Sequence, residues 1–173
     1  MSYTFCYVFC ATPFDGAGEL KAFQETLSDF NAAEAMPRGF LFTSLVIMPA
    51  LADKRAFQGA VDDNIRMCRY YIQVLEDSWG PPQRDYERDW ALVQRFIADP
   101  ELPMRDAVIL FRSPLLPHKV DPAIVELKQN LLSRGGPHAS FDNLEQFKAI
   151  LSPLFSRWLA SIVAERGTGA GAG

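Results

Sequence analysis

Two short segments of this sequence gather side chains that can make hydrogen bonds, stack on rings and act as acids or bases. Each segment directly follows an apolar run, and each is rich in the glycines and prolines that form turns. The first segment supplies Thr12, Pro13, Phe14 and Asp15. The second segment supplies Asp77, Ser78, Trp79, Tyr86 and Glu87. We predict that these residues form one ligand site if the fold brings the two segments together.

Apolar runs typical of buried strands alternate with amphipathic runs along the whole chain. The strand-like runs are at residues 3–11, 40–48, 70–75, 106–112 and 138–141, of which the last is short. Helices are expected at residues 19–31, 53–68, 85–98, 122–133 and beyond Asp142, where Pro153 should kink or split the last one. This alternation predicts an α/β fold, namely a flavodoxin-like three-layer sandwich with a central parallel sheet of four to five strands.

The expected strand order, 2-1-3-4-5, determines where a ligand would bind. In open α/β sheets the ligand lies outside the carboxyl ends of the strands, at the point where the strand order reverses. Here that point falls between the first and third strands, which the two polar segments follow. We therefore expect the segments to converge there and to form a crevice.

Several standard chemistries have no matching pattern in the sequence. Gly16-Ala17-Gly18 lacks the third glycine of a dinucleotide fingerprint, and no Gly-Lys-Ser/Thr phosphate loop is present. His118 and His138 fall away from the expected crevice, which disfavours a Ser-His-Asp triad. No cysteine and histidine set has zinc-ligand spacing.

Composition and charge define a general class. The formal net charge is −4, and no basic stripe is visible, so nucleic acids and anionic membrane surfaces are not expected partners. Three cysteines are too few for a disulfide framework, and the sequence shows neither a signal-peptide pattern nor a membrane-spanning apolar run. We expect a cytoplasmic protein with a single domain at residues 1–166 and a flexible Gly/Ala tail at 167–173.

Over residues 5–150 the layout resembles bacterial Toll/interleukin-1 receptor (TIR)-like domains, which group with nucleoside deoxyribosyltransferases. The family's first strand ends in a Ser/Thr-rich turn with an aromatic residue and an acid, as residues 8–15 do here. Its third strand leads into Gly-x-x-Tyr/Trp-Gly, and here the third strand leads into Glu76-Asp77-Ser78-Trp79-Gly80. An acid then begins a helix with Ala four residues later, matched by Glu87 and Ala91. The family's closing Phe-Asp-x-x-x-x-Phe pattern is found at residues 141–147.

The resemblance implies a TIR-like signalling or defence domain that cleaves the nicotinamide–ribose bond of NAD. The nicotinamide leaves as a neutral molecule, so no general acid is needed and a carboxylate can stabilise the oxocarbenium-like ribose. Glu87 would be that carboxylate, with NAD as substrate and no cofactor required. Trp79 and Tyr86 would stack on the nicotinamide or adenine ring, and Thr12 and Asp15 would bind ribose hydroxyls or amide groups.

Other interpretations of the same residues stay open. An acid in the first turn of a helix is favoured by the helix dipole alone, which is sufficient to explain Glu87. The family's Ser/Thr three residues before the acid is Arg84 here, which could pair with a phosphate or block the pocket. The fold could also serve as a non-catalytic interaction module that forms homo-oligomers or binds other signalling domains. A deoxyribosyltransferase-like enzyme would need a second acid near Glu87, such as Asp15 or Asp77.

Overall fold

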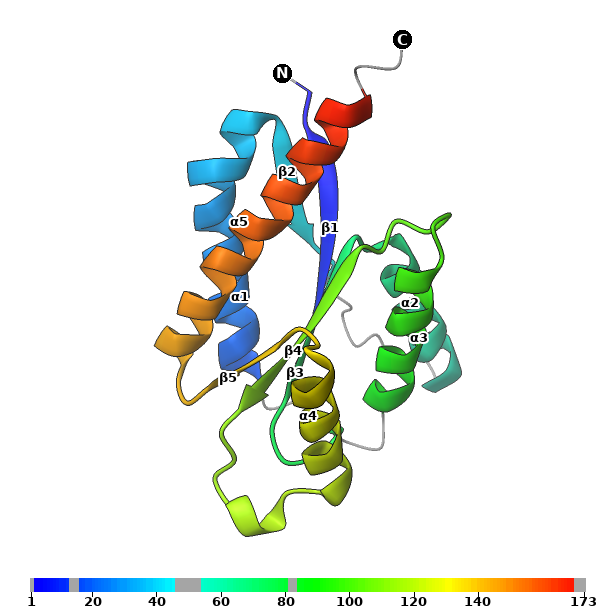
Figure 1. Ribbon diagram of the computed structural model, residues 1–173, viewed down its shortest axis with the longest axis vertical. Coiled ribbons are helices and arrows are strands. Elements are labelled where there is room, and N and C mark those ends of the chain that lie inside the picture. The colour runs from blue at the N-terminus through cyan, green and yellow to red at the C-terminus, as the bar shows by residue number, and fades with distance from the viewer. Residues whose placement is uncertain (1, 13–15, 46–53, 81–83, 170–173) are drawn as a thin grey trace.

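Five parallel strands form one sheet at the centre of the molecule (Figure 1). The computed structural model describes residues 2–12, 16–45, 54–80 and 84–169, without the side chains at 54, 55, 168 and 169. The strands are β1 (Thr4–Ala11), β2 (Phe40–Ser44), β3 (Tyr70–Leu75), β4 (Asp106–Arg112) and β5 (His138–Phe141). Their order is β2-β1-β3-β4-β5, and every adjacent pair is parallel. The predicted α/β, flavodoxin-like sandwich is confirmed.

Helices cover both faces of the sheet, as Figure 1 shows. One face carries α1 (Ala17–Phe30) and α5 (Leu144–Gly169), which pack against each other. The opposite face carries α2 (Lys54–Met67), α3 (Tyr86–Ala98) and α4 (Pro122–Arg134). The central strand β3 is shielded from water: all six of its residues are buried, which explains why its sequence is almost wholly apolar.

Aromatic rings dominate the contact between the sheet and the α1–α5 layer. Tyr70 of β3 stacks on Trp158 of α5 with ring centroids 4.3 Å apart. Phe155, the preceding inward residue of α5, meets Phe23 of α1 edge-on at 5.9 Å. Rings of this size bury large apolar areas, so this layer is a principal source of folding free energy.

The opposite layer begins with apolar packing but also holds polar groups. Phe9 of β1 stacks on Tyr71 of β3 at 5.7 Å, beneath Val61 of α2 and Val93 of α3. On this same face Gln73 is completely buried and accepts a 2.8 Å hydrogen bond from the Tyr71 hydroxyl. Its amide group donates to the backbone oxygens of Ala11 and Val74. The sheet is therefore partly polar on the α2–α3 side.

The turn after α1 differs from the sequence expectation. A helix ending at Asn31 is predicted, but the chain continues through a π-helical turn, η1 (Asn31–Ala35), and a short 3-10 turn, η2 (Met36–Arg38). The Asn31 side chain donates to the carbonyl oxygen of Phe42 at 2.8 Å and accepts from its amide at 2.9 Å. This pairing with β2 holds the turn, and no local pattern reveals it.

The last helix is also longer than expected, and it is not interrupted. α5 continues through Pro153, which lies on its exposed side, without splitting, and it includes residues 167–169 of the predicted tail. Its segment Leu144–Gly167 has the length and hydropathy of a membrane span. However, Phe147, Leu151 and Trp158 are buried against the sheet, so its apolar character is used in the core.

Candidate functional site

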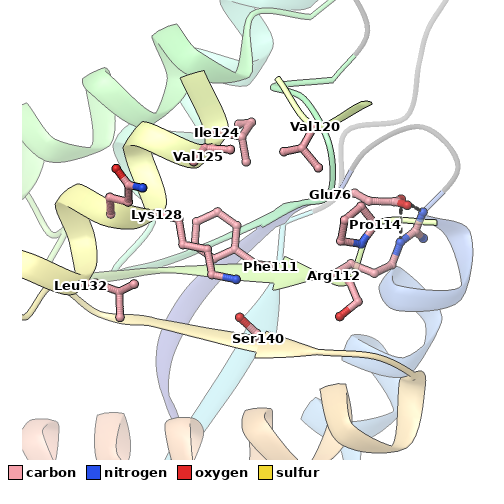
Figure 2. A pocket seen from close by; sticks show the side chains of 12 residues that line it. Glu76, Phe111, Arg112, Pro114, Val120, Ile124, Val125, Lys128, Leu132 and Ser140 are labelled. Atoms are coloured by element: carbon pink, nitrogen blue, oxygen red, sulfur yellow. Dashed lines mark hydrogen bonds and ion pairs between the residues drawn. The ribbon is translucent and has the colours of Figure 1, made fainter. Parts of the chain in front are cut away.

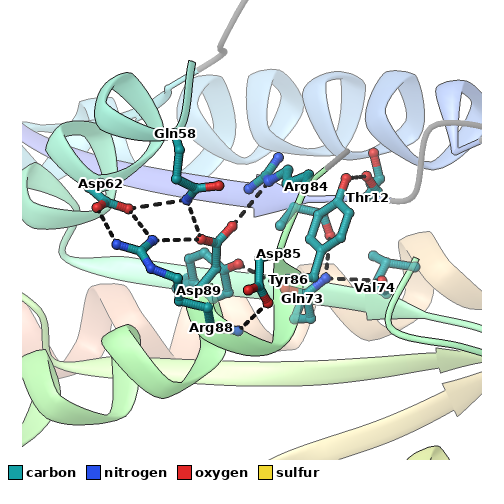
Figure 3. A network of polar contacts seen from close by, with 12 residues as sticks. Thr12, Gln58, Asp62, Gln73, Val74, Arg84, Asp85, Tyr86, Arg88 and Asp89 are labelled. Carbon is teal, nitrogen blue, oxygen red and sulfur yellow. Dashed lines mark hydrogen bonds and ion pairs between the residues drawn. The ribbon is translucent and has the colours of Figure 1, made fainter. Parts of the chain in front are cut away.

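The candidate site lies where the strand order reverses. β1 pairs with β2 on one side and with β3 on the other, so the connections after β1 and after β3 leave the same edge of the sheet. The described residues around this point are Thr12 after β1 and Arg84–Asp89 at the start of α3. We call this group, together with Gln58 of α2, the switch-point site, and Figure 3 shows its polar contacts.

One hydrogen bond joins the two segments that the sequence predicts to converge. The Tyr86 hydroxyl donates to the carbonyl oxygen of Thr12 at 2.6 Å across 74 positions of the chain. Gly80 makes room for the Tyr86 ring: it has φ +104°, and a Cβ there would lie 2.9 Å from Tyr86 Cδ2. The start of α3 is thus fixed against the end of β1, as the predicted strand order requires.

Arg84 lies within this junction rather than at its rim. Its guanidinium carbon is 4.4 Å from the centre of the Tyr86 ring and 5.4 Å from that of Phe9. Only 13% of the side chain is exposed. Its Nε donates to Asp89 at 3.0 Å, whereas its buried Nη2 has no hydrogen-bond partner among the described residues. Because Nη2 is buried, an anionic ligand atom could satisfy this donor only by entering the junction.

Asp89 is the acid of α3 that faces the sheet. It has no exposed surface, and its two carboxylate oxygens accept from Arg84 Nε and from Gln58 Nε2, the latter at 2.9 Å. Asp62 of α2 accepts two hydrogen bonds from Arg88, which ties the outer side of the two helices together. The buried acid therefore serves to hold α2, α3 and Arg84 in place.

Burial determines the acid–base properties of these groups. Removal from water raises the pKa of Asp89 above its ordinary value, and the neighbouring Arg84 guanidinium opposes this effect only in part. Burial likewise raises the pKa of Tyr86, which keeps its hydroxyl protonated as a donor to Thr12. By contrast, the hydrogen bonds from Arg88 lower the pKa of Asp62.

Glu87, the predicted catalytic acid, is exposed on the first turn of α3. The buried residues of this helix, Tyr86, Asp89 and Val93, define an inner face from which Glu87 points away. Nothing in the described part of the chain forms an ion pair with it. Its catalytic role stays a prediction, and the structure gives the inward position to Asp89 instead.

The remaining predicted site residues are placed differently from one another. Ser78 accepts from the amide of Gly80 through its Oγ, and the half-buried Trp79 packs between the clusters under α3 and α4. Asp77 is exposed, and its carbonyl oxygen accepts from the amide of Asp121 at 2.7 Å. Pro13, Phe14 and Asp15 lie outside the described residues. Of the two acids considered for a deoxyribosyltransferase, Asp77 is therefore exposed and Asp15 belongs to the part that is not described.

A second charged group at this edge was not predicted. Arg112, at the end of β4, donates to Glu19 of α1 at 2.9 Å and also pairs with Glu76, which follows β3. Glu19 is only 5% exposed. The sequence signals were an acid in the first turn of a helix and an arginine closing an apolar strand, and both are too common to indicate a pairing. This triad provides carboxylate oxygens beside the switch point.

Comparisons with known proteins add a weak structural similarity. No protein-family model matches the chain, and no curated protein matches it. Among solved structures, general stress protein 14 of Treponema denticola in complex with FMN is similar at 12% identity with a TM-score of 0.39. The match covers 91% of this chain and 99% of that one. At this level the flavin is a property of that protein alone. Within the described residues, no group of three or more His, Cys, Asp or Glu side chains is arranged to hold a metal ion.

Proposed function

We propose that this protein is a TIR-like domain that binds a nucleotide such as NAD at the switch-point site. The observation that carries the proposal is the junction itself. The hydrogen bond from Tyr86 to Thr12 joins two distant segments at the position where α/β sheets bind ligands, and Arg84 brings an unsatisfied donor to it.

The polar groups suit the parts of a nucleotide. Arg84 offers a planar cationic donor group of the kind that recognises phosphate oxygens. The carboxylates of Glu76 and Glu19, which Arg112 holds in place, can accept hydrogen bonds from ribose hydroxyls. Trp79 is half-buried and offers a ring for stacking, whereas Tyr86 is already covered by Arg84.

Cleavage of the nicotinamide–ribose bond by Glu87 is the catalytic form of this proposal. The C–N bond would break with its electron pair passing to the nicotinamide nitrogen, and water would then add to the ribose cation and release a proton. Asp89 would have to leave Arg84 and Gln58 to assist, so the exposed Glu87 is the acid of this turn that is available.

The outward direction of Glu87 favours a second candidate, a domain that binds its ligand without cleaving it. Such a protein would act through assembly with other copies or with other signalling domains. Light scattering with and without NAD, alongside a nicotinamide assay, separates the two forms. Turnover supports the enzyme, whereas ligand-dependent association without turnover supports the binding module.

Calorimetric titration with NAD tests the site directly. Arg84→Lys keeps a positive charge beside Asp89 but loses the planar fork, so we expect affinity to fall about tenfold. Arg95→Lys, at an exposed position of the same helix, is the matched control and should bind like the natural protein. Unchanged affinity in Arg84→Lys, or no binding by the natural protein, would contradict the proposal.

Glu87→Gln should bind NAD normally and lose nicotinamide release, and equal release would exclude Glu87 as the catalytic acid.

A further inference from the structure

A separate pocket opens between the end of the sheet and α4 (Figure 2). Its volume is about 320 Å³, at the lower end of the range of small-molecule sites. Phe111 of β4 and Ser140 of β5, which are register partners on adjacent strands, form its floor. Val125, Lys128 and Leu132 of α4 form its other wall.

The apolar side of this pocket is open to solvent. Val125 is 44% exposed and Leu132 is 60% exposed, although both belong to the helix that covers this part of the sheet. Opposite them β5 presents only the Ser140 hydroxyl, beside the Phe111 ring of β4. As a result α4 leaves the edge of the sheet incompletely covered, and apolar surface remains available to a ligand.

Lys128 supplies the charge of the pocket. Its Nζ lies 5.1 Å from the centre of the Phe111 ring, and Figure 2 shows the side chain reaching across that ring towards Ser140. No acidic side chain pairs with Lys128 in the described part of the protein. The other cation, Arg112, is already paired with Glu19 and Glu76. Lys128 is half-buried and unpaired among the described residues, whereas Glu76, the acid that lines the same pocket, is paired with Arg112.

We propose that this pocket binds a small amphipathic anion, an aromatic or aliphatic carboxylate whose charged group pairs with Lys128. The apolar part of the ligand would lie against Val125 and Leu132, and the Ser140 hydroxyl would donate to the second carboxylate oxygen. The pocket is on the α4 side of β4 and β5, whereas the switch-point site lies between β1 and β3. Glu76, which the nucleotide proposal uses, also lines this pocket, but the inference rests on Lys128, Phe111 and Ser140 and stands without that proposal.

Naphthoate and its neutral analogue naphthamide are suitable probes, because they differ in charge and share one ring system. Titration followed by amide resonances should show shifts at Phe111, Ser140 and along α4. Lys128→Met keeps the apolar stem, and it should weaken naphthoate binding about tenfold while changing naphthamide binding little. Lys21→Met, on the opposite face of the sheet, removes the same charge and should leave both affinities unchanged.

A second variant tests the location by filling the space. Ser140→Phe should abolish binding of both probes without changing NAD affinity, since the ring would occupy the pocket. The proposal is overturned if naphthoate shifts only resonances elsewhere or fails to bind. It is also overturned if Lys128→Met binds naphthoate as tightly as the natural protein does, or if Ser140→Phe retains binding.

Discussion

The two faces of the sheet are packed with different kinds of side chain. The α1–α5 face is built largely from stacked and edge-on rings, such as Tyr70 on Trp158 and Phe155 on Phe23. The α2–α3 face adds a fully buried acid, Asp89, and a nearly buried cation, Arg84, at its carboxyl edge. A buried ion pair contributes little net stability compared with apolar packing of the same volume. The ring-lined face therefore stabilises the fold, whereas the polar face gives up stability at the position of the candidate site.

Removing a ring from the α1–α5 face should have the largest effect on stability. Phe155 is completely buried and contacts Phe23, Phe30 and Trp158. Phe155→Ala should lower the free energy of unfolding by about 3–5 kcal/mol, because it removes apolar contacts and leaves a cavity. Urea unfolding followed by circular dichroism measures this change. A loss below about 1 kcal/mol would show that the ring layer is not the main source of stability.

Breaking the ion pair on the opposite face should cost nearly as much. Asp89→Ala leaves the Arg84 guanidinium buried without its carboxylate, and we expect a loss of about 3 kcal/mol. The double variant Asp89→Ala with Arg84→Met measures how much of this loss comes from the unpaired charge. It should regain about 1–3 kcal/mol, because the stranded charge is removed. If the second change costs further stability, the Arg84 side chain stabilises the fold through contacts other than Asp89.

These two regions also differ in how well they can be predicted from sequence. The strands β3, β4 and β5 match their predicted residues, and Asp121 caps α4 with Pro122 at the first helical position as expected. Apolar runs and helix caps are local, so a single sequence contains them. The order of the strands followed from chain length and alternation alone, and it placed the switch point correctly.

The contents of the site were less predictable because they depend on distant partners. Asp89 and Glu87 are two positions apart, and only the packing of α3 decides which one turns inward. Gln58 and Asp89 are 31 positions apart, and Glu19 and Arg112 are 93 apart. No periodicity records such pairings. For the same reason Arg84 was expected at the mouth of the site, whereas it lies beneath it between two rings.

The pH dependence of stability offers a finer test of the polar face. Because burial raises the pKa of Asp89 in the folded state, the folded protein binds this proton more tightly than the unfolded chain does. The stability that this group contributes is complete below its unfolded pKa of about 3.9 and is lost as the pH rises through the folded pKa. Subtracting the unfolding free energy of Asp89→Asn from that of the natural protein isolates this group. The difference should decline with rising pH in that window and then become constant, and a rising difference would mean that the Arg84 pair outweighs burial.

The smallest effect on stability is expected at Glu87. This prediction concerns the function of the polar face. Glu87→Gln should change the free energy of unfolding by no more than about 0.5 kcal/mol, since the side chain is exposed and loses only its interaction with the helix dipole. Glu101→Gln, an exposed acid beyond the end of α3, is the matched control. Thermal unfolding of both variants measures the difference. A much larger loss would mean that Glu87 holds a structural contact, and any loss of nicotinamide release could then not be assigned to chemistry. If stability is unchanged, the two acids of one helical turn divide their roles: Asp89 maintains the site, and Glu87 is free to act on a ligand.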